Sequence, residues 1–317
     1  MIRSGFLRAA AIVAALLILT GCGKSDGAQD VQFDGGRAYE ILKKQCSFGP
    51  RYPNTPGHDK MVEYLQAELK PLSDGVTVHS FTYNTGKKEL EIKNICAVFN
   101  PDASEYVLLC AHWDTRPWAD EEIDQAKRNL PVPGANDGAS GVAVLLELAR
   151  MFHIKRPSVG VIMVFFDGED YGPSTRDMFI GSTRFAKEWR TALKPIIKRS
   201  DYKIKYGILL DMVGDSSLQL PRERKSMMMA GDIVDKVWAV ARKAGYGNIF
   251  TDTGGYSIAD DHVPLNMVGI KCIDIIDFDY AYWHTIEDTP DKCSAKSLQI
   301  VGEVVSKVVY EESVQAK

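Results

Sequence analysis

Three apolar runs constrain the fold of this chain more than any other feature of its sequence. They occupy Val159–Phe166, Tyr206–Val213 and Val268–Ile276. A strand with one face in water alternates apolar and polar residues, so an apolar run of this length indicates a strand that is buried on both faces. Strands of this kind form parallel sheets that are covered by helices on both sides. The runs therefore predict a mostly parallel central sheet.

Segments with helical periodicity lie between the predicted strands. In Gly57–Lys70, for example, Met61, Leu65 and Leu69 recur at helical spacing. Strands that alternate with helices predict a single α/β domain with a twisted, mostly parallel central sheet flanked by helices. The chain of 317 residues is long enough for one such domain of roughly 250–300 residues. We expect helices at Gly57–Lys70, Gly138–Met151, Asp232–Ala244 and Ala295–Tyr310, further strands at Ile92–Phe99 and Tyr106–Ala111, and loops around a site at Pro117–Pro133, Tyr171–Gly181 and Ser216–Ser226.

The N-terminus has the pattern of an export signal. Arg3 and Arg8 are followed by the apolar segment Ala9–Leu19 and then by Thr-Gly-Cys22, which resembles a bacterial lipobox. We expect residues 1–21 to be a signal peptide, 22–36 to be a lipidated cysteine and flexible tether, and 37–317 to be a catalytic domain. The mature chain is then an exported bacterial lipoprotein on a periplasm-facing membrane, either inner or outer. An ordinary signal peptide or a membrane anchor is the alternative interpretation.

Charge and cysteine usage argue against a nucleic-acid site and against a thiolate zinc site. The formal net charge is −4 and no long basic run is present, which argues against a nucleic-acid partner. The six cysteines include no CxxC pair, so the sequence does not indicate a thiolate zinc site. Cys96, Cys110 and Cys272 lie in apolar runs and are expected to be buried core residues. The disulfide pairing and the oligomeric state stay open.

Metal-capable side chains cluster where the predicted strands end. In open α/β sheets, ligands bind beyond the carboxyl ends of the strands, so these side chains are expected to share one site. Taken singly, Asp137 could cap a helix, Asp211 could cap a turn, and His284 could be an ordinary surface or core histidine. The complete set is His112, Asp114, Asp137, Asp167, Glu169, Asp170, Asp211, Asp260, Asp261, His262 and His284.

The residue types in this set favour zinc. Carboxylates with one or two imidazoles, and without thiolates, suit a catalytic zinc ion that keeps one position open. Glu169 and Asp170 are adjacent, and neighbouring residues on an extended backbone point to opposite sides. One of them can therefore bind metal while the other acts as a general acid or base. If the loop turned at this point, both could instead be solvated charges.

A set of motifs carries a family resemblance. The segments AHWDT, GANDGASGVAVLLELAR, FFDGEDYG, LLDMVGD, ADDHVPL and YWHTIEDTPD occur in this order. Together they resemble the metallo-aminopeptidase clan of zinc exopeptidases, and within it the bacterial glutaminyl cyclases. The resemblance covers the chain from about Phe48 onwards. It implies a zinc exopeptidase-like three-layer sandwich.

The resemblance implies different metal sites in the two branches of the clan. In a cyclase, one zinc ion per chain is held by Asp137, Asp170 and His284. In an aminopeptidase, a second zinc ion is added, and it is held by His112, Asp137 and Asp211. The cyclase branch carries Asp at the position of Asp260, where aminopeptidases commonly carry Ser, and this favours the cyclase. His112 is retained, so it is either a second-metal ligand or a supporting residue.

The cyclase resemblance also implies roles for the remaining residues. Glu169 is expected to be the general base, Asp211 and Asp260 to form an acid network, and Trp283 to wall the substrate pocket, with a core aromatic as the alternative. The reaction is cyclisation of the N-terminal glutamine of peptides and proteins to pyroglutamate, with release of ammonia. The family motif usually reads Glu-Glu, so Glu169-Asp170 is a departure, and Ala259 is another. A zinc aminopeptidase and a non-catalytic peptide-binding lipoprotein are the alternatives.

Overall fold

A computed structural model describes Met1 and residues 31–312 of the chain. The predicted signal peptide and Cys22 lie outside the described residues. The predicted tether, residues 22–36, is wrong at its C-terminal end. Phe33 is already buried and packs against Gly302. Helix α1 (Gly35–Cys46) also begins before the predicted tether ends. The Asp34 carboxylate starts this helix by accepting a hydrogen bond from the Arg37 backbone N–H.

The core of the fold is a six-stranded sheet in the order β1-β2-β4-β3-β5-β8. Strands β4, β3, β5 and β8 are parallel to one another, whereas β2 is antiparallel to both of its neighbours. The predicted mostly parallel sheet is therefore confirmed. The strands are β1 (Gly75–Asn84), β2 (Glu89–Phe99), β3 (Glu105–His112), β4 (Gly160–Phe166), β5 (Lys203–Asp211) and β8 (Cys272–Ile276).

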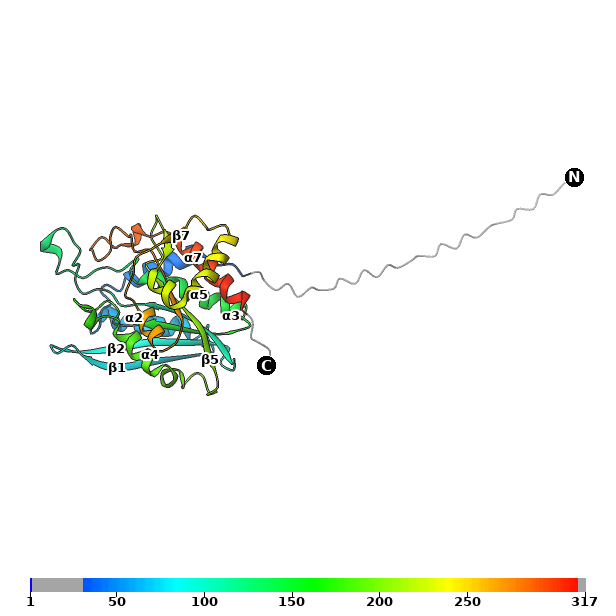
Figure 1. The fold of residues 1–317 in the computed structure, drawn as a ribbon, viewed down its shortest axis with the longest axis horizontal. Helices are drawn as coiled ribbons and strands as arrows, with labels where there is room; N and C mark the ends of the chain where they lie inside the picture. The colour runs from blue at the N-terminus through cyan, green and yellow to red at the C-terminus, as the bar shows by residue number, and fades with distance from the viewer. Residues whose placement is uncertain (2–30, 313–317) are drawn as a thin grey trace. The chain divides into compact units, whose positions relative to one another are not determined.

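Helices cover both faces of the sheet, which makes three layers (Figure 1). Alternate residues of each strand enter opposite cores: Leu109 of β3 packs in the larger cluster, and Leu108 packs in the smaller one. Cys96, Cys110 and Cys272 are buried in the smaller cluster, as expected. The larger cluster contains α1, α2 (Pro56–Leu69), α3 (Ala139–Ile154), α5 (Arg224–Lys243) and α7 (Ala295–Glu311), and the smaller contains α4 (Ile180–Leu193) and α6 (His262–Met267).

The predicted loop Ser216–Ser226 is more ordered than its composition indicates. It contains strand β6, Leu220–Arg222, which pairs in parallel with β7, Phe250–Gly254. Helix α5 begins inside the same segment because the Glu223 carboxylate accepts hydrogen bonds from the first backbone N–H groups of the helix. Within the described residues, no helix is both long and apolar enough to span a bilayer.

The order of the strands places a crevice at their carboxyl ends. The chain leaves β3 through α3 to reach β4 on one side, and it then returns through α4 to reach β5 on the other side of β3. Such a reversal of direction opens a crevice beyond the strand ends. The register aligns these ends, because His112 lies beside Phe166 and Asp211 lies beside Ile276.

Candidate active site

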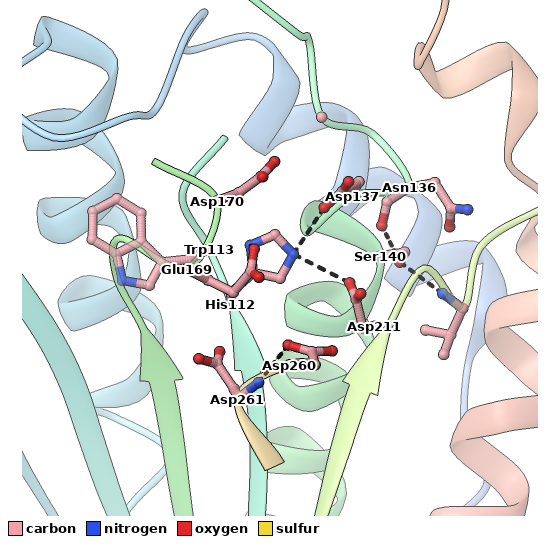
Figure 2. A network of polar contacts seen from close by, with 12 residues as sticks. His112, Trp113, Asn136, Asp137, Ser140, Glu169, Asp170, Asp211, Asp260 and Asp261 are labelled. Atoms are coloured by element: carbon pink, nitrogen blue, oxygen red, sulfur yellow. Dashed lines mark hydrogen bonds and ion pairs between the residues drawn. The ribbon is translucent and has the colours of Figure 1, made fainter. Parts of the chain in front are cut away.

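His112, at the end of β3, is surrounded by carboxylates. Its Nε2 lies 3.0 Å from Asp137 Oδ1 and 3.2 Å from Asp211 Oδ1 (Figure 2). Its Nδ1 lies 3.7 Å from Glu169 Oε2. Burial alone would lower the pKa of His112, but Glu169 and the hydrogen-bonded carboxylates raise it well above its usual value. Strands β3 and β5 and the start of α3 thus meet at one imidazole.

A second imidazole completes a group of three metal-capable residues. His284 Nε2 lies 3.3 Å from Asp170 Oδ1 and 3.7 Å from Asp137 Oδ2. One donor atom from each of these residues lies within 4.8 Å of the others, and all three residues are buried. His112, Asp137 and Asp211 form another such group. Asp137 is therefore common to two donor sets.

The loop after β4 sends its two acidic side chains in different directions. The Asp170 carboxylate lies 3.3 Å from His284 Nε2. The Glu169 carboxylate instead lies beside His112, and Figure 2 shows the two acids pointing apart. The loop is held by Asp114, whose two carboxylate oxygens accept hydrogen bonds from the backbone N–H groups of Glu169, at 3.1 Å, and Asp170, at 3.2 Å. Asp114, a candidate ligand in the sequence, therefore acts on the backbone of this loop.

Asp260 adds a further carboxylate beneath this group. Its Oδ1 accepts a hydrogen bond from the Asp261 backbone N–H at 2.5 Å, while its Oδ2 is buried without a partner among the described residues. Burial and the Asp211 charge raise the pKa of Asp260 to about 7. Burial also raises the pKa of Glu169 well above its usual range, with His112 opposing and the neighbouring acids reinforcing the shift. Like charges this close favour sharing of protons among them.

A small cavity opens above these acids. It holds about 330 Å³ of space, and its walls include Ile258, Ile276, Phe278 and Trp283. The Trp283 ring stacks on His284, with ring centroids 3.8 Å apart and planes 26° apart. Trp283 is thus half-buried, and it both supports a candidate ligand and lines the cavity. The acids Asp137, Glu169, Asp170, Asp211 and Asp260 form the opposite lining.

Two supporting residues, Arg116 and Asp120, were not predicted from the sequence. The guanidinium of Arg116 donates two hydrogen bonds of 2.6 Å to the Asp120 carboxylate and one of 2.6 Å to Asp170 Oδ1. Asp120 in turn lies 3.2 Å from His284 Nδ1. These contacts orient both candidate ligands from behind. The only signal in the sequence is an Arg–Asp pair four residues apart, a spacing that is common on exposed helices.

The position of Asp137 depends on its backbone neighbours. The Asp288 carboxylate accepts hydrogen bonds from the backbone N–H groups of Asn136, at 2.8 Å, and Asp137, at 3.2 Å. The helix N-cap is Gly138, so the alternative role of Asp137 as a cap is not observed. A Cβ atom at Gly138 would overlap the His112 ring, so only glycine allows Asp137 and His112 to lie this close.

Other candidates from the sequence lie outside the two donor sets that share Asp137. Asp167 lies 2.8 Å from the buried His58 Nε2 and also accepts a hydrogen bond from the Lys93 backbone N–H, so it joins α2 to the sheet. His262 lies with Asp260 and Asp274 in a third buried group of metal-capable residues. Asp260 also lines the active-site cavity, so this third group extends the same site into the core.

The comparison with known proteins agrees with this geometry. Residues 94–309, more than half of the chain, match the sequence profile of Peptidase family M28. The chain belongs to peptidase family M28. The fold and the resemblance to zinc exopeptidases that the sequence indicated are thereby confirmed.

Two solved structures and one further relative show what this M28 chain is similar to. A glutaminyl cyclase from Bacteroides thetaiotaomicron, bound to N-acetylhistamine, is 38% identical, with a TM-score of 0.83 and coverage of 89% of this chain and 99% of that chain. A leucine aminopeptidase precursor from the same species is also 38% identical, with a TM-score of 0.84 and the same coverage. Glutaminyl-peptide cyclotransferase from Drosophila melanogaster is 27% identical over 266 residues, which make up 75% of this chain and 70% of the relative.

We expect Asp120→Asn to weaken metal binding while the fold is kept. The amide cannot accept from both His284 and Arg116 as a charged carboxylate does, and loss of such a supporting partner typically costs about 10–100-fold in metal affinity. Competition with a chelator measures the change. Asp124→Asn is the matched control, because Asp124 caps an exposed turn in the same insertion. Equal affinities in the two variants would show that Asp120 does not support the metal site.

Proposed function

We propose that this chain cyclises the N-terminal glutamine of peptides and proteins to pyroglutamate and releases ammonia. The observation that carries the proposal is the buried carboxylate of Asp260, which lines the same cavity as Asp211 and Glu169. A site with this extra acid can share protons within the cluster while Glu169 accepts and returns one. Similarity to named glutaminyl cyclases supports the same conclusion.

The cofactor that we propose is one zinc ion per chain, bound by Asp137, Asp170 and His284. Ligand atoms about 2.0–2.2 Å from a tetrahedral zinc ion lie about 3.3–3.6 Å from one another. The separations of 3.3 and 3.7 Å around His284 are close to this spacing. The separations of 3.0 and 3.2 Å around His112 are short enough for direct hydrogen bonds, so His112 can hold Asp137 and Asp211 in place in a site with one metal ion.

The reaction is an intramolecular aminolysis, and this chain needs no nucleophile of its own for it. When bound, zinc would polarise the carbonyl of the substrate's side-chain amide and stabilise the negative charge on its oxygen. Glu169 accepts a proton from the α-amine as its nitrogen bonds to the amide carbon. The bond from that carbon to the amide nitrogen then breaks, and Glu169 returns the proton so that ammonia leaves. Asp211 and Asp260 hold the surrounding protons in place.

The cavity supports a small side chain as the group that reacts. Its space of about 330 Å³ includes the open mouth of the cavity, so the enclosed part is smaller than a typical ligand pocket and suits a single side chain. Trp283 and Phe278, whose ring centroids lie 5.0 Å apart, form an apolar wall that faces the acids. A glutamine side chain can place its methylene groups on this wall and its amide against the acidic side. We therefore assign substrate binding to Trp283.

A zinc aminopeptidase is the second candidate function. The observation that favours it is Asp137, which belongs to both donor sets and could bridge two ions. The similarity to a leucine aminopeptidase precursor is as high as that to a cyclase. The two functions differ in the product released: a cyclase releases ammonia, whereas an aminopeptidase releases the N-terminal residue.

We also propose that the protein is an exported lipoprotein, acylated at Cys22 and held on a periplasm-facing membrane. The support is the charged start, the short apolar segment and the Leu-Thr-Gly-Cys sequence. Two acyl signals on one cysteine suffice for stable anchoring, whereas one chain binds only marginally. The catalytic domain then faces the periplasm, where it can meet exported peptides and proteins.

The reaction itself is tested with a Gln-initiated peptide followed by mass spectrometry. We expect the peptide to lose one ammonia and keep all its residues. The same peptide with N-terminal Asn is the control, since its shorter side chain would have to close a four-membered ring. Loss of the terminal residue would instead establish the aminopeptidase.

Glu169→Gln and Asp170→Asn should separate proton transfer from metal binding. Glu169→Gln keeps size and hydrogen bonding but removes the proton acceptor, so we expect zinc to stay and kcat to fall by about 10²–10⁴. Asp170→Asn replaces an anionic ligand with a neutral one, so zinc affinity should fall. Zinc content and rate are measured on the same samples. The opposite pattern would reverse the two assignments.

The number of zinc ions bound per chain distinguishes a cyclase from an aminopeptidase. After extensive dialysis against trace zinc, elemental analysis should give close to one equivalent per chain. His112→Gln should leave this value unchanged if His112 only supports the neighbouring carboxylates. Two tightly held equivalents in the unmodified protein would favour the aminopeptidase.

Acylation is tested by fractionating cells that express the full chain. We expect the protein in the membrane fraction, and Cys22→Ala should release it to the soluble fraction or block its maturation. Cys46→Ala is the control, because Cys46 lies in helix α1 of the folded domain. An unmodified Cys22 and unchanged fractionation of Cys22→Ala would contradict the anchor.

A further inference from the structure

A groove lies between the edge strand β1 and helix α4, next to the active-site cavity. It holds about 640 Å³ of space, more than the active-site cavity itself. It is formed by the face of β1, by one side of α4 and by the loop that joins β4 to α4. The side chains that matter for its chemistry are Phe81, Tyr83, Arg176, Met178, Arg184 and Lys187.

One residue connects this groove to the active site. Met178 lines the groove on one side and the active-site cavity on the other. It belongs to the same loop as Glu169 and Asp170, and the Phe179 backbone N–H donates a hydrogen bond to the Glu169 carbonyl at 2.9 Å. A chain that leaves the cavity past Met178 therefore enters the groove directly.

Strand β1, which lines one side of the groove, also has an edge that an extended peptide can use. Within residues 31–312, β1 pairs only with β2, so its other edge keeps free backbone N–H and C=O groups. Phe81 and Tyr83 line the groove from this strand, two residues apart and hence on the same face. An edge strand with alternating side-chain pockets is a common docking mode for extended peptides.

The charged side chains that line the groove are positive, whereas the active site and the chain as a whole are acidic. The lining contains the cations Arg176, Arg184 and Lys187 and no carboxylate. Of the acids that contact lining side chains, Asp177 accepts a hydrogen bond from the Tyr83 hydroxyl at 3.0 Å. Arg184 is paired with Glu188 at 3.0 Å. Among the described residues, neither Arg176 nor Lys187 is paired with a carboxylate, and both are exposed. A chain with net charge −4 and an acidic active site thus presents two available cations beside its cavity.

We propose that this groove binds the part of a peptide substrate that follows its N-terminal glutamine, and that it selects substrates with acidic residues there. The proposal rests on the proposed cyclase function. Arg176 lies two residues from Met178, so their Cα atoms are at most about 7 Å apart, or two extended peptide residues. Acidic side chains within about the first five substrate residues can therefore reach Arg176, and Lys187 lines the same groove from α4.

The test compares hexapeptides that differ only at positions three to five. Each begins with glutamine, and the three positions carry either glutamate or its neutral analogue glutamine. Ammonia release gives kcat/KM for both peptides. We expect the acidic peptide to be favoured about three- to tenfold at low salt, the effect of one or two exposed ion pairs, through KM and not kcat. The ratio should approach one in 1 M salt, where charges are screened over about 3 Å.

Variants locate the effect in the groove. Arg176→Gln combined with Lys187→Gln should bring the ratio of the two kcat/KM values close to one. Because the ratio compares two substrates with the same sample, it does not depend on how much of the variant is folded. The control, Lys194→Gln with Lys198→Gln, removes the same charge at the far end of α4 and should keep the ratio.

The outcomes separate this proposal from the function on which it rests. Ammonia release at equal rates from both peptides overturns the acidic subsite and leaves the cyclase intact. A preference that persists in the groove variant, or that the control also loses, overturns the placement in this groove. If neither peptide releases ammonia, the cyclase function and this subsite fall together.

Discussion

Buried carboxylates crowd together at one edge of the sheet, and the surrounding loops, imidazoles and guanidinium group are arranged to compensate their charge. Asp137, Asp170 and Asp211 converge there because the carboxyl ends of the parallel strands and the start of helix α3 lie at the same edge of the sheet. A buried carboxylate is costly unless cations or donors compensate it. The protein supplies two imidazoles and the guanidinium of Arg116. Burial and the remaining excess of negative charge raise the pKa of Asp260, and the same excess makes the site suitable for a metal cation.

Compensation by backbone groups is what holds the site rigid. Asp114 and Asp288 each bind two consecutive backbone N–H groups, and each thereby fixes the loop that carries one candidate ligand. Neither carboxylate faces the cavity, so their charges are used for positioning. The candidate ligands Asp137 and Asp170 consequently point into the site before any substrate arrives, which is the preorganisation that electrostatic catalysis requires.

Much of the fold and of the candidate site could be predicted because both follow from local patterns. The run Val159–Phe166 became a strand buried on both faces, and the acids that follow it lie at the sheet edge as expected. The short strand β6 was missed because its three residues carry no periodicity. The tether boundary was misplaced because the burial of Phe33 depends on Gly302, far along the chain. Arg116 and Asp120 were missed because a charged pair in a polar insertion reads as solvated surface.

Local patterns were enough to predict the class of fold and the chemical types available to the site, since hydrophobic periodicity and residue identity are local properties. The resemblance to one clan added the expectation that Asp260 favours its cyclase branch. Which acids face the cavity and which hold backbone became clear only from the packing of the segments, as Asp170 and Asp114 illustrate. The same holds for the groove beside Met178, whose lining comes from β1, α4 and the loop between β4 and α4. Distances between such segments depend on how the layers pack, and no short stretch of sequence encodes them.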